Sequence, residues 1–293
     1  MSAGHHIRTA TSSDLVHWKL GPDALPSLPS WTNGKDTWAP DVSLHNDTTL
    51  RMYFAATRGS DGVMCIGIAT SPATSPTGPF TASETPVVCS NTSAGHSRFS
   101  AIDPKLWVAP NGVSYLFFGS GGDPIRAVVV DADGGTRAVG PTFDVLHTDA
   151  TPYSSLVEAP WVYTAPSGEL LMLYSGNNCC GEHAHYAVLA ASSPSGSPLG
   201  PWEKLGGGDK SSVILSSSAA ATAPGHNAVI RDEAGVDWAF YHANNGPKPC
   251  AAQYCSRTLF VDRVWYNATG ANGRGGWPWV GGPSGGPRQA PTV

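Results

Sequence analysis

Charged residues are scarce in this 293-residue sequence. Asp, Glu, Lys and Arg make up 13% of it, about half the usual share in globular proteins. The net charge of −5 and pI near 6.0 give no electrostatic basis for binding nucleic acid. No apolar run is long enough to span a bilayer. Residues 2–6 also lack the hydrophobic segment of a secretion signal.

Several common catalytic and metal-binding patterns are also missing. The sequence contains no glycine-rich phosphate loop and no nucleophile elbow. It has no CxxC pair, which disfavours metal binding by the cysteines. His183 and His185 alternate as ligands on one strand face would, and Cys179 and Cys180 are nearby. We nevertheless favour a loop or rim position for these histidines over a metal site.

Glycine and proline are abundant, and the apolar segments between them repeat. With 34 Gly and 25 Pro, the composition favours an all-β, turn-dense chain. Four segments each place one polar residue in a short apolar strand, at intervals of roughly 60 residues. The segments are 38–42, 101–106, 157–161 and 225–230, and their polar residues are Asp41, Asp103, Glu158 and His226. Aromatic-rich second strands follow at 51–56, 114–119, 169–175 and 237–242, and third strands at 66–71, 126–131, 186–191 and 258–264.

This period indicates a β-propeller with about four strands per blade. Residues 6–18 resemble a third strand and its turn, with no first and second strands before them. We therefore predict a five-bladed propeller whose first blade is incomplete. The expected domain covers residues 1–280, with the first-blade inner strands and the secretion signal lost by N-terminal truncation. A Gly/Pro-rich tail, 281–293, is expected to end in loosely ordered coil.

Cysteines and sequons favour a secreted glycoprotein. The cysteine count is six, an even number. Local spacing suggests Cys65–Cys89 and Cys250–Cys255, while Cys179–Cys180 could form a vicinal bridge, stay free or pair elsewhere. Glycosylation sequons begin at Asn46, Asn91 and Asn267.

The motifs together resemble glycoside hydrolase family 43. They are Trp38-Ala-Pro-Asp-Val42, Ile102-Asp-Pro104, Val157-Glu-Ala-Pro160, Gly225-His226, and the closing segment 257–265 with Gly276-Trp-Pro278. The resemblance implies a five-bladed propeller that hydrolyses α-L-arabinofuranosyl or β-D-xylosyl linkages in plant cell-wall polysaccharide, with inversion. We expect an extracellular monomer that acts on arabinose- or xylose-containing glycans, with no nucleic-acid or membrane partner and no required cofactor.

The resemblance also implies roles for two carboxyl groups. Glu158 matches the general acid, and Asp103 matches the residue that tunes the pKa of the acid and orients it. A buried carboxyl beside a second carboxylate resists ionisation, as a general acid must. An inverting glycosidase also needs a base roughly 6.5–9.5 Å from the acid. The strand that carries this base in the family is absent from the sequence, so the base is not assigned. Taken alone, Glu158 could instead be an edge-strand residue facing water.

Five further residues are candidates with alternatives. His226 matches a family histidine near a central cation, reached through water. A structural Ca²⁺ would need oxygen ligands besides His226, and a structural role for His226 is equally open. Arg257 resembles an arginine near the two carboxyl groups, or is a solvated edge residue. Trp38 and Trp161 are candidates for stacking on sugar rings, or they pack within blades. Asp41 is expected to hold loops or the channel wall beside the substrate, and its replacement of the missing base is the less favoured alternative.

Two other functions remain open. A propeller without its general base would bind sugar without hydrolysing it. A retaining enzyme of the invertase kind would need a Glu-Cys segment, whereas Ala and Pro follow Glu158 here.

Overall fold

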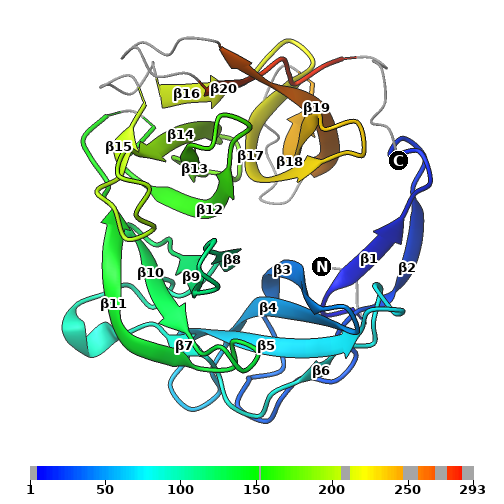
Figure 1. Ribbon diagram of the computed structural model, residues 1–293, viewed down its shortest axis with the longest axis vertical. Helices are drawn as coiled ribbons and strands as arrows, with labels where there is room; N and C mark the ends of the chain where they lie inside the picture. Colours follow the sequence, from blue (N-terminus) through cyan, green and yellow to red (C-terminus); the bar gives the residue numbers. More distant parts are fainter. Residues whose placement is uncertain (1–4, 152, 206–211, 247–256, 268–275, 286–293) are drawn as a thin grey trace. The chain divides into compact units, whose positions relative to one another are not determined.

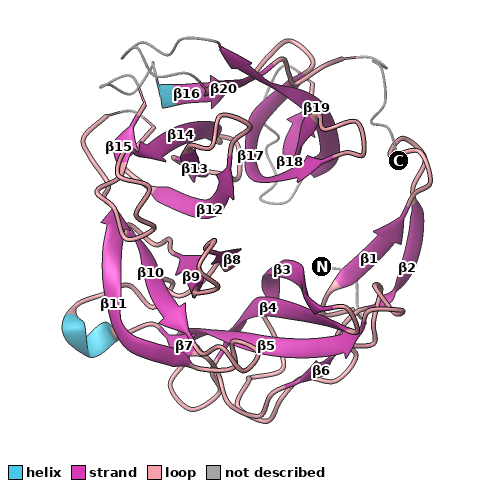
Figure 2. Cartoon of the chain, in the orientation of Figure 1, coloured by secondary structure: helices cyan, strands magenta, loops and turns pink. Residues whose placement is uncertain are grey.

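The structure is a computed structural model that describes residues 5–151, 153–205, 212–246, 257–267 and 276–285. Strands dominate these residues (Figure 2), which confirms the predicted all-β class. The chain divides into two compact units. Unit 1 is formed by Met1–Ser12 and His17–Asp144, and unit 2 by Ser13–Val16 and Val145–Val293. None of the described helices is long and apolar enough to cross a membrane.

Unit 1 contains two antiparallel sheets and a separate strand pair (Figure 1). The first sheet is formed by β3 (Trp38–Asn46), β4 (Thr49–Thr57), β5 (Met64–Pro72) and β6 (Thr81–Ala82), with β7 (Val88–Cys89) paired to β5. The second is formed by β8 (Lys105–Val108), β9 (Ser114–Phe118), β10 (Ile125–Val130) and β11 (Ala138–Leu146). Strands β1 (Arg8–Thr11) and β2 (Lys19–Asp23) pair only with each other among the described strands. A short 3-10 helix, η1 (Thr92–Ala94), precedes β8.

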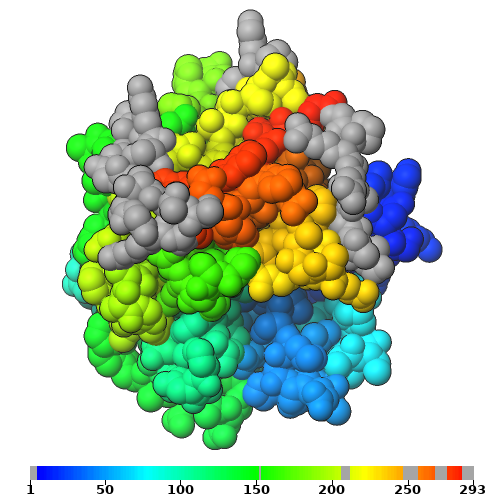
Figure 3. All heavy atoms as spheres, turned by 45° about the horizontal axis from the view of Figure 1, so that its top comes forward, coloured from blue at the N-terminus to red at the C-terminus, as the bar shows by residue number. Residues whose placement is uncertain are grey.

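Unit 2 contains the other two sheets. One is formed by β12 (Val157–Thr164), β13 (Leu170–Gly176), β14 (Ala187–Ser193) and β15 (Glu203–Lys204), with β16 (Val213–Leu215) paired to β14. The other is formed by β17 (Ala221–Arg231), β18 (Asp237–Asn245), β19 (Arg257–Asn267) and β20 (Trp277–Val280). This last sheet, coloured from yellow to red, reaches the surface on the face drawn in Figure 3.

All four large sheets are meanders whose strand order follows the chain, as in the blades of a propeller. Strands that are covered on both faces lose the alternation of polar and apolar residues. Every described side chain of β13 is buried, for example. Within each unit the two sheets share a core: Tyr53 clusters with Leu116 in unit 1, and Leu173 with Tyr241 in unit 2. The four predicted repeats are therefore confirmed, whereas five blades and an incomplete first blade stay predictions.

Each large sheet has a kinked first strand or strand entry at a residue that precedes proline. These residues have a left-handed backbone, with φ between 49° and 56°, and are Ala39, Asp103, Ala159 and Ala223. That conformation costs an L-residue about 1–2 kcal/mol. The prolines therefore mark equivalent positions of the four segments, and the four polar residues do not coincide at them. Glu158 is equivalent to Thr222 rather than to His226, and Asp103 is equivalent to Ala159. A slip of one residue matters because it moves a side chain to the other face of a strand.

Two of the three suggested disulfides are present. Cys65 and Cys89 are bonded across the paired strands β5 and β7. Cys179 and Cys180 form the vicinal bridge. The suggested pair Cys250–Cys255 lies outside the described residues, as do residues 286–293 of the predicted tail.

Candidate active site

Glu158 lies near the start of β12 and is half-buried. The hydroxyl of Tyr186 donates a 2.5 Å hydrogen bond to its Oε1 atom. Tyr186 directly precedes β14 and is only 1% exposed. The Glu158 carboxyl is thus held by a buried tyrosine. This contact differs from the alternative in which Glu158 only faces water.

The Tyr186 ring fits closely against the backbone of β17. A Cβ atom added to Gly225 would lie 2.0 Å from Cε1 of that ring. Real carbon atoms cannot approach so closely, so only glycine fits at this position. His242, from β18, stacks on the same ring with 5.8 Å between centroids and 12° between planes. In the Gly225-His226 motif, the glycine therefore serves to let the Tyr186 ring pack against the strand.

Two histidines and an arginine complete this part of unit 2. The backbone N–H of His226 donates to Ser175 Oγ at 2.7 Å, and its ring lies 6.4 Å from that of His242. Arg257 Nη1 lies 3.1 Å from His242 Nε2. Because a guanidinium only donates, this contact requires a neutral His242 that accepts at Nε2.

Both histidines are disposed to remain uncharged. Desolvation lowers the pKa of His226, the nearby Glu158 carboxylate opposes this shift, and the positive charge of Arg257 adds to it. The pKa of His242 is well below its usual value, through desolvation first and then through Arg257 and His226. Near neutral pH the cluster therefore carries one carboxyl, one guanidinium and two neutral imidazoles.

The surroundings of His226 do not fit a directly bound calcium ion. Among the described residues, no three His, Cys, Asp or Glu side chains converge on one point. The groups around His226 in unit 2 include an imidazole and a guanidinium, whereas Ca²⁺ prefers several oxygen ligands. A cation reached through water stays a prediction, and no catalytic step is derived from one.

Asp103 and Asp41 belong to unit 1. Asp103 is 7% exposed and has the left-handed backbone described above, immediately before β8. Asp41 is 5% exposed and joins two sheets. Its carboxylate lies 3.1 Å from Lys105 Nζ and accepts from the Leu106 N–H at 2.9 Å. These contacts fasten β3 to β8, and a role of Asp41 in the channel wall stays a prediction. Pairing between Asp103 and Glu158, which lie in different units, stays a prediction.

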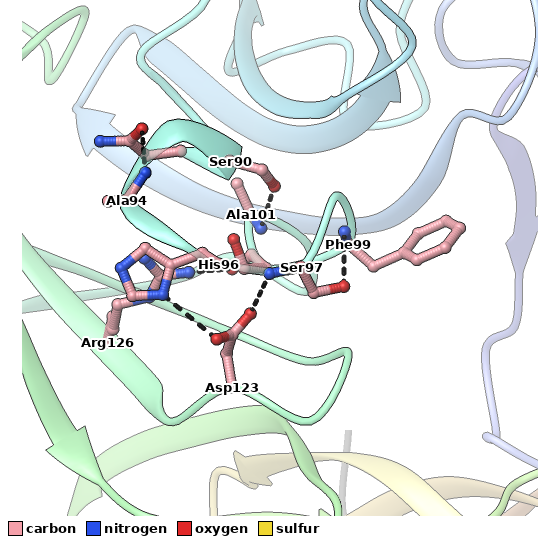
Figure 4. Close-up of polar contacts among 10 residues, drawn as sticks. Ser90, Ala94, His96, Ser97, Phe99, Ala101, Asp123 and Arg126 are labelled. Carbon is pink, nitrogen blue, oxygen red and sulfur yellow. Dashed lines mark hydrogen bonds and ion pairs between the residues drawn. The ribbon is translucent and has the colours of Figure 1, made fainter.

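The candidate sugar-stacking tryptophans both pack against protein. Trp38 stacks on Phe99 with 6.3 Å between ring centroids. The loop that carries Phe99 is fastened by Asp123, which accepts from Ser97 N–H at 2.7 Å and contacts His96 Nδ1 at 3.1 Å (Figure 4). Trp161 packs on the core cluster of unit 2. Both rings remain partly exposed, so sugar stacking stays a prediction.

His183 and His185 have separate contacts. His183 Nε2 lies 3.3 Å from Glu182, whereas His185 Nε2 lies 2.7 Å from the Tyr153 hydroxyl. Both lie in the connection between β13 and β14, in agreement with the loop position favoured from sequence.

Sequence reasoning missed Tyr186, His242 and Ser175 as parts of the site. Tyr186 was visible only as the first residue of a predicted third strand. The glycine beside His226 was a weak signal, since a strand-interior glycine often marks a close approach.

The structure thus places a half-buried carboxyl, held by a tyrosine, at the first strand of a blade-like sheet. Comparison with known proteins gives the family: the chain belongs to the glycosyl hydrolases family 43, which its residues 2–272 match. Membership places it among the glycosidases.

Curated relatives are named as arabinan-degrading enzymes. The chain is similar to the extracellular endo-alpha-(1->5)-L-arabinanase 1 of Bacillus subtilis, with 27% identity over 197 residues. That match covers 64% of this chain and 58% of the relative, so it spans less than two thirds of the relative's length. A probable arabinan endo-1,5-alpha-L-arabinosidase A of Neosartorya fischeri is 28% identical over 256 residues, covering 82% of this chain and 76% of that protein.

Solved structures agree on the fold. A thermostable family-43 glycoside hydrolase matches with a TM-score of 0.77 and 25% identity, over 98% of this chain and 88% of that one. The Cellvibrio cellulosa α-L-arabinanase complexed with arabinohexaose matches with a TM-score of 0.75, over 94% of this chain and 89% of that one. Its 20% identity supports a common fold alone.

Proposed function

We propose that this protein hydrolyses α-1,5-linked L-arabinofuranosyl units of arabinan with inversion, and that Glu158 is its general acid. The observation that carries the proposal is the Glu158 carboxyl held by Tyr186, in a chain that belongs to family 43. The names of both curated relatives favour arabinan over xylan. β-D-Xylosyl linkages are the second substrate class to be tested.

The hydrogen bond suggests which oxygen of Glu158 delivers the proton. Tyr186 donates to Oε1, so the proton of the neutral acid resides on Oε2 and passes from there to the leaving glycosidic oxygen. Once Glu158 is ionised, the same donor stabilises its charge. In an inverting reaction a second carboxylate activates water on the opposite face of the sugar. We assign no residue to that role, and propose that Asp103 tunes and orients the acid.

The wider setting of this activity is also part of the proposal. We infer an extracellular enzyme with a five-bladed β-propeller, whose hydrolysis uses only carboxyl groups and water. The four meander sheets support the propeller. Two disulfides, and a Bacillus relative whose name includes "extracellular", support the location.

The decisive experiment compares the wild type with Glu158→Gln on linear arabinan and on xylan. We expect arabino-oligosaccharides from the wild type and a loss of about 10²–10⁴-fold in kcat in the variant, because a neutral amide cannot supply the proton. The melting temperature should stay the same. Glu203→Gln, in β15 of the same sheet, is the matched control and should retain full activity.

Each unfavourable outcome has a distinct meaning. An active Glu158→Gln variant would contradict the acid assignment. Faster release of sugar from xylan than from arabinan would contradict the substrate. Wild-type protein that binds arabino-oligosaccharides without releasing product would favour a sugar-binding protein instead.

A further inference from the structure

The connection between β13 and β14 contains the vicinal disulfide, and hydrogen bonds join the two ends of this loop. Cys179 and Cys180 are bonded to each other. The side chain of Asn178 donates to the Cys180 carbonyl at 3.0 Å and accepts from the Cys180 N–H at 3.3 Å. The Asn178 carbonyl accepts from the His185 N–H at 2.9 Å. The loop therefore returns to its own start immediately before Tyr186.

This disulfide packs beside the tyrosine that holds Glu158. Cys179 lies against an apolar cluster formed by Ala184, Tyr186 and Ala223. The Tyr186 ring also lies against the backbone of Gly225 and the ring of His242. The loop with its disulfide thus borders the pocket that fixes the tyrosine.

The Cys179–Cys180 disulfide should contribute little to the global stability of the protein. A disulfide stabilises a protein mainly by restricting a loop in the unfolded chain, and the effect grows with loop length. Cys65–Cys89 spans 24 positions of sequence, whereas Cys179–Cys180 spans one. A bond between neighbours closes almost no loop. What it does supply is local rigidity, because it removes the side-chain freedom of both cysteines.

We propose that the Cys179–Cys180 disulfide is a positioning element for the acid, which holds Tyr186 in place and, through its hydroxyl, the carboxyl of Glu158. The inference rests on the proposed function of Glu158. It makes the activity sensitive to reduction: a dithiol gives two electrons and two protons to the S–S bond, which becomes two thiols, while the dithiol itself is oxidised to a cyclic disulfide.

A double-mutant cycle tests the proposal. The first variant is Cys179→Ser/Cys180→Ser and the second is Tyr186→Phe. The third variant carries all three substitutions. We expect kcat on arabinan to fall about 10–100-fold in each of the first two, since small displacements of catalytic groups have effects of this size. KM should change little. The combination should lose no more than Tyr186→Phe alone, because both changes remove the same support.

A pH profile separates positioning from general damage. Without the Tyr186 donor the ionised form of Glu158 is less stabilised, so the alkaline limb of kcat should move to higher pH in Tyr186→Phe and in the serine variant alike. Cys65→Ser/Cys89→Ser is the control and should lower the melting temperature with no movement of that limb. If the serine variant folds poorly, mild dithiol treatment of Cys65→Ser/Cys89→Ser, compared with the same variant untreated, reports on the Cys179–Cys180 bond.

Hydrogen–deuterium exchange supplies a readout independent of turnover. We expect faster exchange across residues 177–187 in the serine variant and unchanged exchange across β5. Additive effects in the cycle, or unchanged kinetics with unchanged exchange, would overturn the proposal. If the wild type hydrolyses no glycan, the proposed function fails, and the exchange measurement alone decides whether the disulfide holds Tyr186.

Discussion

Single residues of the site are fixed by close packing rather than by charge. Tyr186 reaches Glu158 because Gly225 leaves space for its ring, and because His242 covers the ring by stacking. Glycine contributes nothing chemical here. Its value is the absence of a Cβ atom at a point where the strand backbone touches an aromatic ring.

Gly225→Ala should therefore damage both stability and catalysis. The added methyl group overlaps the ring, and overpacking of this kind costs about 1–3 kcal/mol. Displacement of Tyr186 should lower kcat on arabinan about 10–100-fold. Gly235→Ala is the control: its φ of 77° makes alanine strained, but nothing lies within 4 Å of the new Cβ. Gly235→Ala should lose stability alone, and equal kinetics in the two variants would contradict the packing argument.

The neutral histidines predict a dependence of stability on pH. The unfolded chain protonates His242 near pH 6.5, whereas the folded protein does so only at lower pH. Folding stability should be fully present above about pH 6.5 and decline as the pH falls through the lowered folded pKa. Denaturant melts at several pH values, compared between the wild type and His242→Gln, measure this contribution.

The contacts of His242 identify the control. Its ring meets Tyr186, His226 and Arg257, so protonation would place two positive charges together. His183 is exposed and lies 3.3 Å from a carboxylate oxygen of Glu182, so its protonation would place opposite charges together. We expect His183→Gln to keep the wild-type slope. A slope unchanged in His242→Gln as well would refute the assignment.

At the scale of elements, neighbouring sheets are joined by buried polar side chains as well as by apolar cores. In unit 1, Asp41 of β3 contacts Lys105 and the Leu106 N–H of β8. In unit 2, the Tyr266 hydroxyl of β19 donates to Asp237 at 2.6 Å, and its oxygen lies 3.1 Å from the Tyr163 hydroxyl of β12. Such bonds fix how one strand lies against the next.

Asp41→Asn should weaken unit 1. Removing one partner of a buried ion pair costs about 3–5 kcal/mol of stability, since the remaining charge is poorly solvated. The asparagine can still accept from the Leu106 N–H, so we expect a loss of stability near the lower end of this range. Asp61→Asn removes an exposed carboxylate from Arg58 and should hardly change the melting temperature. If the two variants melt alike, the Asp41 contact does not join the sheets.

At the scale of the whole molecule, the family and the fold predict ligand-linked stability. A sugar that binds only the folded state raises the free energy of unfolding by about 2.7 kcal/mol at one hundred times its Kd. We expect arabino-oligosaccharides to raise the melting temperature of Glu158→Gln, in which turnover is blocked. Xylo-oligosaccharides of equal length are the control, and an equal shift with both would contradict selectivity for arabinan.

The sequence predicted correctly those features that depend on short stretches of neighbouring residues. Short apolar segments with one polar residue, aromatic-rich second strands and Gly/Pro turns predicted four repeats, because each is a property of a few neighbouring residues. The ordered motifs around Asp103 and Glu158 pointed to the family. The position at which the four segments correspond was not predicted, and the left-handed residues before proline mark it in the structure.

The sequence by itself therefore determined the all-β class, the repeats, the family and the candidate acid. Only the tertiary structure decided that Tyr186 holds Glu158, that Gly225 makes room for it, and that Asp41 joins β3 to β8. These contacts join residues far apart in the chain. Their geometry depends on strand register and on which side chains face each other across sheets, and no local pattern of residues fixes either.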